Sequence, residues 1–185
     1  MKMLKIDNRE VLNELRDQAK EVIDNSKCRI LICAGTGCLA GGSAQIYEKI
    51  CELVKSNPNI EVHFGPEIAH GDEDHHRYGE IGVKKSGCHG FCEMGPLMRI
   101  EPMGLLYTKV SVDDCEEIFE KTIKNGEIIS RLLYKQDGKE YQKQEEIPFY
   151  KKQTRLVLEN CGHIDAEHRK DIFMCVQNTH LQSAD

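Results

Sequence analysis

Four cysteines in two glycine-rich loops constrain this 185-residue chain more than any other feature of its sequence. Cys33 and Cys38 are separated by four residues, and Cys88 and Cys92 are separated by three. A thiolate is a strong metal ligand, and four thiolates suit either a zinc ion or an iron–sulfur cluster. We therefore expect a fold that brings the two loops together, so that all four sulfurs bind one metal centre.

The residues around these cysteines favour a [2Fe–2S] cluster but leave other sites open. Glycine lets backbone N–H groups come close to sulfur, and such hydrogen bonds tune an iron–sulfur centre. The loop glycines are Gly35, Gly37, Gly87, Gly90 and Gly95. Spacing alone does not separate the cluster from zinc. A thiol–disulfide redox site is a third and weaker alternative, because no C-x-x-C pair is present.

The overall composition indicates a reducing compartment and no nucleic-acid partner. The formal net charge is -6 and the pI is about 5.8, so no basic binding surface is indicated. No apolar run reaches the roughly 20 residues that span a bilayer, and the N-terminus has no signal-peptide core. Nine cysteines, an odd number, favour metal or redox chemistry over disulfides. We therefore expect a cytoplasmic protein without membrane insertion.

The hydrophobic pattern predicts an α/β fold with a cysteine loop after each of two strands. The predicted strands cover residues 28–33, 60–64, 81–83, 97–100 and 105–110. The predicted helices cover residues 8–26, 43–56 with Ser43 as the cap, and about 111–125 with Ser111 or Asp113 as the cap and Gly126 as the stop. The order β-α-β followed by β-β-α predicts a thioredoxin-like fold, a small mixed sheet flanked by helices.

The chain divides into three predicted parts. Residues 1–26 form an N-terminal helix that we expect to pack on the domain, with docking to a partner as the alternative, and residues 27–127 form the thioredoxin-like domain. Residues 128–185 are a more polar extension with a linker or exposed hairpin, a short strand at 155–158 and a last helix from Asp165. This extension has too few apolar residues for its own core, so we expect it to lie against the domain, a partner or a missing part.

Several other residues with metal-binding or redox chemistry have simpler interpretations. His89, between two candidate ligands, is either a hydrogen-bond donor to sulfur or a polar loop residue, and we favour the latter. Glu93 is expected to be an exposed loop carboxylate. Structural roles are expected for Cys28, Cys51 and Cys115, and no role is assigned to Cys161 and Cys175. A solvated surface, rather than a metal site, is expected for His63, His70, His75 and His76.

Two segments, residues 30–38 and 87–96, together resemble the thioredoxin-like [2Fe–2S] ferredoxin family, and both cysteine spacings match. The resemblance is to the form at the N-terminus of the NADH- and FMN-binding subunit of NAD(P)-linked hydrogenases. The small iron–sulfur subunit of respiratory complex I is related to it. Residues 131–134, 148–153 and 158–165 resemble the segment that opens the flavin-binding part of such subunits.

The resemblance implies that Cys33, Cys38, Cys88 and Cys92 ligate one [2Fe–2S] cluster. That cluster would relay single electrons in a multisubunit NAD(P)H-linked oxidoreductase of the hydrogenase or NADH dehydrogenase type, with flavin- and iron–sulfur-containing subunits as partners. The sequence departs from the family by ending at Asp185, before a glycine-rich FMN and NADH site, so the resemblance does not imply NADH oxidation. The alternatives are a zinc-stabilised interaction module and a non-functional fragment of a longer flavin-binding subunit.

Overall fold

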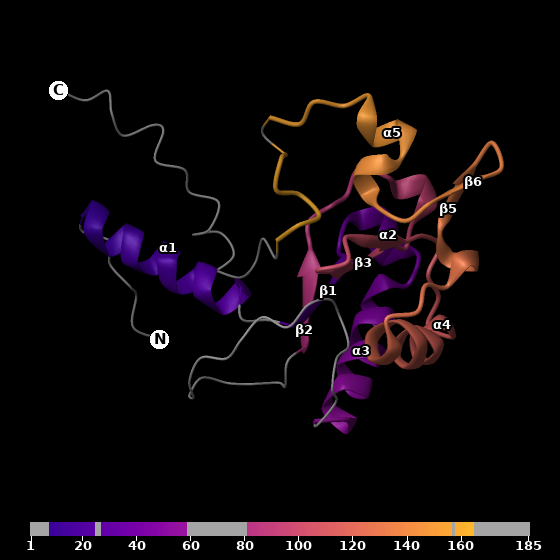
Figure 1. Cartoon of the computed structure of the whole chain (residues 1–185), viewed down its shortest axis with the longest axis horizontal. Coiled ribbons are helices and arrows are strands. Elements are labelled where there is room, and N and C mark those ends of the chain that lie inside the picture. Colours follow the sequence, from indigo (N-terminus) through magenta and orange to yellow (C-terminus); the bar gives the residue numbers. More distant parts are fainter. Residues whose placement is uncertain (1–7, 25–26, 59–80, 157, 165–185) are drawn as a thin grey trace.

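A mixed four-stranded sheet lies at the centre of the protein (Figure 1). The computed structural model describes residues 8–24, 27–58, 81–156 and 158–164. The strands are β1 (Cys28–Cys33), β2 (Ile81–Ser86), β3 (Met98–Glu101) and β4 (Leu105–Tyr107), in the order β2-β1-β3-β4. β2 runs parallel to β1, whereas β3 is antiparallel to both β1 and β4.

Helices flank this sheet in the predicted order. They are α1 (Arg9–Asp24), α2 (Thr36–Ala40), α3 (Ser43–Ser56) and α4 (Asp114–Glu117), which continues as the π-helix η2 (Ile118–Lys124). The sequences β1-α3-β2 and β3-β4-α4 confirm the thioredoxin-like arrangement. The parallel partner of β1 is the strand at residues 81–86, and the predicted strand at 60–64 lies outside the described residues. Within the described ranges, no helix is long and apolar enough to cross a membrane.

The main core fills the space between the sheet and the helices α3 and α4. Side chains alternate between the two faces of a strand, so Ile30 and Ile32 of β1 point to the same side. They pack with Ile46 and Ile50 of α3 and with Phe119 of η2, and all five are almost completely buried. The periodic apolar positions of the sequence therefore form the core that the pattern predicts.

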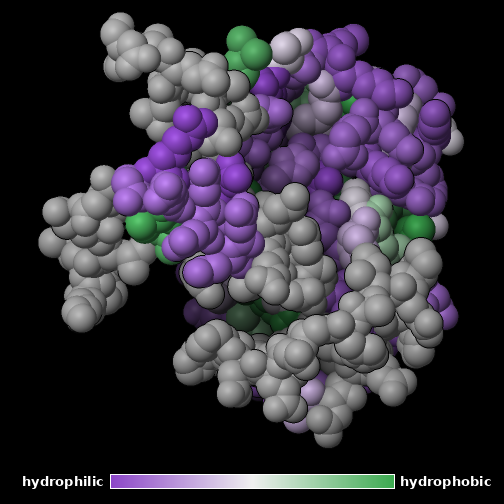
Figure 2. All heavy atoms as spheres, turned by 60° about the vertical axis from the view of Figure 1, so that its left-hand side comes forward, coloured by the Kyte–Doolittle hydropathy of each residue, from purple (hydrophilic) through white to green (hydrophobic). Residues whose placement is uncertain are grey.

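The N-terminal helix α1 does not contribute described residues to this core. Its described side chains are exposed or half-buried, and none of them belongs to either core cluster. Figure 2 shows the molecule from the side on which α1 lies, where the coloured surface is mainly hydrophilic with small hydrophobic areas. Nothing in the described contacts establishes the predicted packing of this helix on the domain, which stays a prediction.

The extension after Gly126 runs along β4 and covers the second face of the sheet. It comprises η3 (Ser130–Leu132), β5 (Tyr134–Gln136), β6 (Lys139–Tyr141), η4 (Gln144–Glu146) and α5 (Pro148–Lys151), with β5 and β6 forming the expected exposed hairpin. The N–H of Leu106 donates to the carbonyl of Gln142 (2.8 Å), and that of Thr108 donates to the carbonyl of Leu132 (2.8 Å). The extension thus lies against the domain, one of the three expected alternatives.

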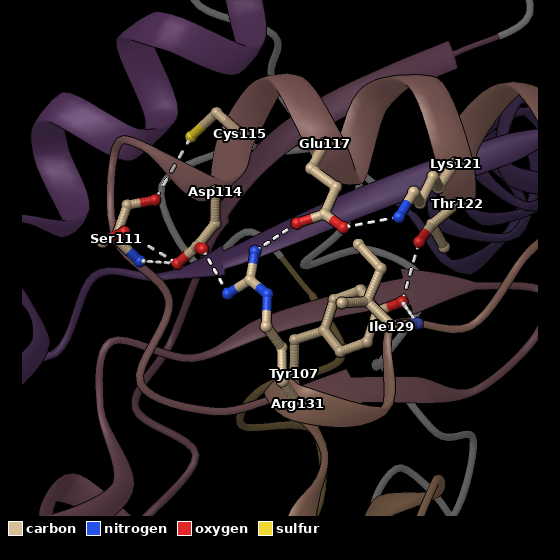
Figure 3. A network of polar contacts seen from close by, with 9 residues as sticks. All are labelled: Tyr107, Ser111, Asp114, Cys115, Glu117, Lys121, Thr122, Ile129 and Arg131. Atoms are coloured by element: carbon tan, nitrogen blue, oxygen red, sulfur yellow. Dashed lines mark hydrogen bonds and ion pairs between the residues drawn. The ribbon is translucent and has the colours of Figure 1, made fainter.

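Arg131 ties the extension to α4 (Figure 3). Its guanidinium contacts Asp114 at 2.5 Å and also pairs with Glu117, so one side chain bridges two carboxylates of one helix. Beside it, the buried hydroxyl of Tyr107 accepts a hydrogen bond from the N–H of Ile129 at 2.9 Å. These contacts fix the first residues of the extension to the sheet and to the helix behind it.

Two local predictions are wrong. Ser43 is the first helical residue of α3 and not its cap; the cap position belongs to Gly42, whose φ of 93° is in the left-handed region that favours glycine. The segment at 155–158 forms no strand where it is described, and Leu156 and Leu158 are exposed. Arg155 instead contacts the loop after β2, where its Nη2 donates to the carbonyl oxygen of His89 at 2.6 Å.

Candidate metal centre

The two cysteine loops meet because β1 and β2 are parallel neighbours. Cys33 is the last residue of β1 and is paired with Ser86, the last residue of β2. Cys38 follows in the short helix α2, while Cys88 and Cys92 belong to the loop after β2, with Cys92 opening η1 (Cys92–Met94). The carboxyl ends of parallel strands lie at one edge of a sheet, and the structure therefore brings all four predicted ligands together.

The sulfur atoms of the two loops lie close to one another. The Sγ atoms of Cys88 and Cys92 are 3.8 Å apart, and the N–H of Gly90 donates to Sγ of Cys88 at 3.3 Å. The thiols of Cys38 and Cys88 both interact with Cys33 and lower its pKa. A tetrahedral metal with bonds of about 2.3 Å to sulfur places two of its ligands about 3.8 Å apart, so the Cys88–Cys92 pair has the spacing for one metal ion.

The site favours a thiolate at Cys33. The interaction with the Cys38 thiol, together with the main-chain N–H groups of His89 and Gly35, outweighs burial and lowers the pKa of Cys33 to about 6. The pKa of Cys38 is raised, first by the same interaction with Cys33, although the main-chain N–H of Leu97 opposes the shift. A thiolate surrounded by N–H donors is the form of cysteine that binds metal.

Glycines make this close approach of the two loops possible. A Cβ atom placed on Gly35 would lie 3.1 Å from Sγ of Cys88, and one placed on Gly95 would lie 2.7 Å from Sγ of Cys38. Real Cβ atoms essentially never come within 3.0 Å of a heavy atom at such a contact. The glycines around the cysteines therefore serve to let one loop pack directly on the sulfurs of the other.

The centre has a buried half and a surface half. Cys33 and Cys38 are each 1% exposed, whereas Cys88 and Cys92 are exposed side chains. Within the part of the chain that the structure describes, no three histidine, cysteine, aspartate or glutamate side chains surround a single ion position. Two candidate ligands, Cys33 and Cys38, therefore lie inside the protein, and the other two, Cys88 and Cys92, lie at its surface.

His89 is fully buried, which corrects the expectation of a polar loop residue. Its Nε2 lies 3.0 Å from the hydroxyl of Ser86, and its Nδ1 lies 2.9 Å from the amide oxygen of Gln144. Burial lowers the pKa of this imidazole to about 4, so it is neutral at neutral pH. No local sequence pattern predicts this environment, because Gln144 lies far along the chain in the extension.

Comparison with known proteins identifies the family. A curated relative, the [2Fe–2S] ferredoxin of Clostridium pasteurianum, is 35% identical over 108 residues, which are 58% of this chain and 96% of that ferredoxin. The chain belongs to the [2Fe–2S] ferredoxin family. A second ferredoxin of this kind, from Aquifex aeolicus, is 26% identical over 96 residues, 52% of this chain and 71% of its own length. No family model matches the chain.

A solved structure is also similar to part of this chain. The thioredoxin-like [2Fe–2S] ferredoxin from Aquifex aeolicus is 22% identical, with a TM-score of 0.46, over 59% of this chain and 97% of that chain. The relatives thus match somewhat more than half of this ferredoxin-family chain, which is longer than the segment shared with them.

Four further cysteines lie within the described residues: Cys28, Cys51, Cys115 and Cys161. Burial raises the pKa of Cys28 to about 12 and that of Cys115 to about 11, so both stay protonated, as expected of structural residues. Cys51 is half-buried on α3. Cys161 is half-buried beside Gly87, with its sulfur 3.7 Å from where a Cβ of that glycine would lie.

Glu93 is exposed, as predicted for a loop carboxylate. Five of the residues considered in the sequence lie outside the described ranges: Cys175, His63, His70, His75 and His76.

Proposed function

We propose that this ferredoxin-family chain holds one [2Fe–2S] cluster on Cys33, Cys38, Cys88 and Cys92 and transfers single electrons through it. When bound, the cluster supplies the one-electron redox chemistry, while the protein supplies ligands, hydrogen bonds and partial burial. The observation that carries the proposal is the convergence of these four sulfurs at the ends of two parallel strands.

The residues present fit such a cluster. All four donors are sulfurs, and they meet pairwise, as two tetrahedral irons with two cysteines each would require. Main-chain N–H groups donate to Cys33 and Cys88, and the glycine Gly95 leaves space beside Cys38 that a larger residue would fill. Cys33 and Cys38 would hold the buried end, and Cys88 and Cys92 the end from which an electron reaches the surface.

Anaerobic purification of the chain tests the cluster directly. We expect about two irons and two acid-labile sulfides per chain, visible absorbance, and an EPR signal after reduction with dithionite. The competing zinc module predicts a colourless protein with about one zinc and no sulfide, and that result would rule out the cluster.

A serine substitution tests the ligand assignment. Cys92→Ser should lose the cluster or make it markedly unstable, because it removes one of four thiolates. Cys51→Ser is the matched control, since Cys51 lies on α3 away from the site, and it should keep full iron and sulfide. Full iron and sulfide in the Cys92 variant would remove that residue from the ligand set.

We further propose that the chain works as one component of a multisubunit NAD(P)H-linked oxidoreductase in the cytoplasm. The exposed pair of Cys88 and Cys92 supports this, because electron transfer needs a partner's redox group close to the cluster. The similarity of residues 131–134, 148–153 and 158–165 to a flavin-binding subunit favours a flavin-containing partner. The reducing cytoplasm keeps thiols free for metal binding.

Electron delivery from such a partner can be measured. The loaded protein is mixed without oxygen with an FMN-containing, NADH-oxidising subunit and NADH, and reduction of the cluster is followed by EPR. We expect reduction that depends on both the flavoprotein and NADH. A cluster that dithionite reduces but the flavoprotein with NADH does not would contradict this part of the proposal.

A further inference from the structure

Three consecutive residues separate the surface ligands Cys88 and Cys92, and each of them touches the C-terminal extension. These residues are His89, Gly90 and Phe91. The contacts are a hydrogen bond from the imidazole, a close approach of a guanidinium to the glycine, and stacking of the aromatic ring. These three residues form the spacer between Cys88 and Cys92. The spacer is therefore held largely by residues of the C-terminal extension.

The imidazole of His89 is fixed at both of its nitrogens. The side-chain oxygen of Gln144 can only accept a hydrogen bond, so Nδ1 carries the proton and donates to it at 2.9 Å. The lone pair of Nε2 then accepts the hydroxyl proton of Ser86 at 3.0 Å. His89 directly follows the candidate ligand Cys88 in the chain. A shift of Gln144 would thus be transmitted through His89 to Cys88.

Arg155 holds the same residue from its main-chain side. Its Nη2 donates to the carbonyl oxygen of His89 at 2.6 Å, and its guanidinium lies over the ring of Tyr150 at 5.0 Å. A Cβ atom on Gly90 would come within 2.9 Å of Nη2, and Gly90 has a φ of 77°. Only glycine combines this backbone conformation with room for the arginine.

Phe91 anchors the other end of the spacer. Its ring stacks on Phe149 with centroids 4.7 Å apart and makes edge contacts with Tyr134 at 5.2 Å and Tyr150 at 5.5 Å. Phe91 is only 7% exposed, so these rings of the extension bury it next to Cys92. The aromatic cluster keeps the loop from moving away from the sheet.

We propose that residues 142–156 and 158–164 position the cluster-binding loop, with Gln144 and Arg155 as positioning residues that set the redox properties of the centre. The proposal rests on the proposed function, because it concerns the cluster assigned to the four cysteines. A cation beside the loop stabilises the reduced cluster, which carries one more negative charge, so Arg155 raises the midpoint potential.

The test compares two substitutions in the full chain that remove the same charge. Arg155→Gln removes a guanidinium that contacts the loop, whereas Lys152→Gln removes an exposed charge from the same segment without a described contact to the loop. We expect Arg155→Gln to keep its iron and sulfide and to show a lower midpoint potential and altered EPR g-values. The Lys152 variant should resemble the unsubstituted protein. Equal potentials and g-values in all three proteins would overturn the proposal.

A second substitution keeps the test decisive if Arg155→Gln does not fold. Gln144→Leu preserves the size of the side chain but removes the acceptor for His89, so it should change the EPR g-values and speed the loss of the cluster to a chelator several-fold. Unchanged spectra and chelation rates would contradict the role of Gln144. An unsubstituted chain that binds no cluster refutes the proposed function itself, whereas a loaded chain with unresponsive variants refutes only this inference.

Discussion

Replacing Gly95 by alanine should expel the cluster while leaving the main chain in its present conformation. Gly95 has φ of -73° and ψ of 164°, an extended conformation that alanine adopts readily, even before a proline. The only new atoms are those of one methyl group. That methyl carbon would lie 2.7 Å from Sγ of Cys38, which is 1% exposed and has little room to move.

The size of the effect follows from that distance. Carbon and sulfur that are not bonded prefer a separation of at least about 3.6 Å, so the overlap is about 0.9 Å. Metal–sulfur distances in a working site vary by only about 0.2 Å, so a sulfur displaced this far cannot keep its bond without moving the loop. Overpacking of a buried site costs about 1–3 kcal/mol, and we expect a loss of that order in the cluster-free protein.

The assay has two readings and a matched control. Iron and sulfide content after anaerobic purification reports the cluster, and urea unfolding of the cluster-free protein reports the packing cost. Gly82→Ala is the control, because a Cβ at Gly82 would have its nearest neighbour at 3.9 Å, an ordinary contact. Full cluster content together with unchanged unfolding free energy in Gly95→Ala would refute the reasoning.

Two further substitutions test the contacts that hold the extension (Figure 3). The buried hydroxyl of Tyr107 shares a hydrogen bond with Thr122 (2.7 Å) and accepts one from a main-chain N–H (2.9 Å). Tyr107→Phe should therefore lower the unfolding free energy by about 1–3 kcal/mol in urea titrations, and a loss below about 0.5 kcal/mol would contradict this. Burial of Asp114 raises its pKa, but hydrogen bonds, including that from Arg131, outweigh burial and leave the pKa below its usual value. The native state then binds this proton less readily than the unfolded chain, so the stabilisation is present at neutral pH and is lost as the pH falls below about 4. Arg131→Gln should lower Tm by at most a few degrees at pH 7 and by less near pH 3, and equal losses at both pH values would argue against the ion pair.

The parts of the fold that sequence reasoning predicted are those encoded locally. The strand at residues 28–33, the helix at 43–56 and the adjacent strands at 97–100 and 105–110 are each encoded by a local apolar pattern, and the structure contains all of them with small shifts in their ends. The four candidate ligands were likewise predicted from sequence, because they form two closely spaced pairs of cysteines. The thioredoxin-like order then placed both loops at one end of the sheet, because parallel strands end at the same edge.

The parts that sequence reasoning missed depend on contacts between distant segments. The burial of His89 requires Gln144, and neither residue has a neighbour in sequence that predicts the pairing. The strand expected at 155–158 had the right composition, but Arg155 instead bonds to the main chain of the distant His89. The cap of α3 is Gly42, one residue before the predicted Ser43. Gly42 takes a left-handed conformation that glycine permits but that its presence alone does not predict.

The pairing of the extension with β4 has a consequence for how the domain behaves by itself. β4 consists of Leu105, Leu106 and Tyr107, three buried apolar residues, and its outer edge is bonded by residues of the extension. A protein cut back to residues 1–127 would lack Leu132 and Gln142 and would expose that edge as an apolar strand with unpaired main-chain groups. Such an edge recruits strands from other molecules, so we expect the extension also to protect the ferredoxin domain from aggregation.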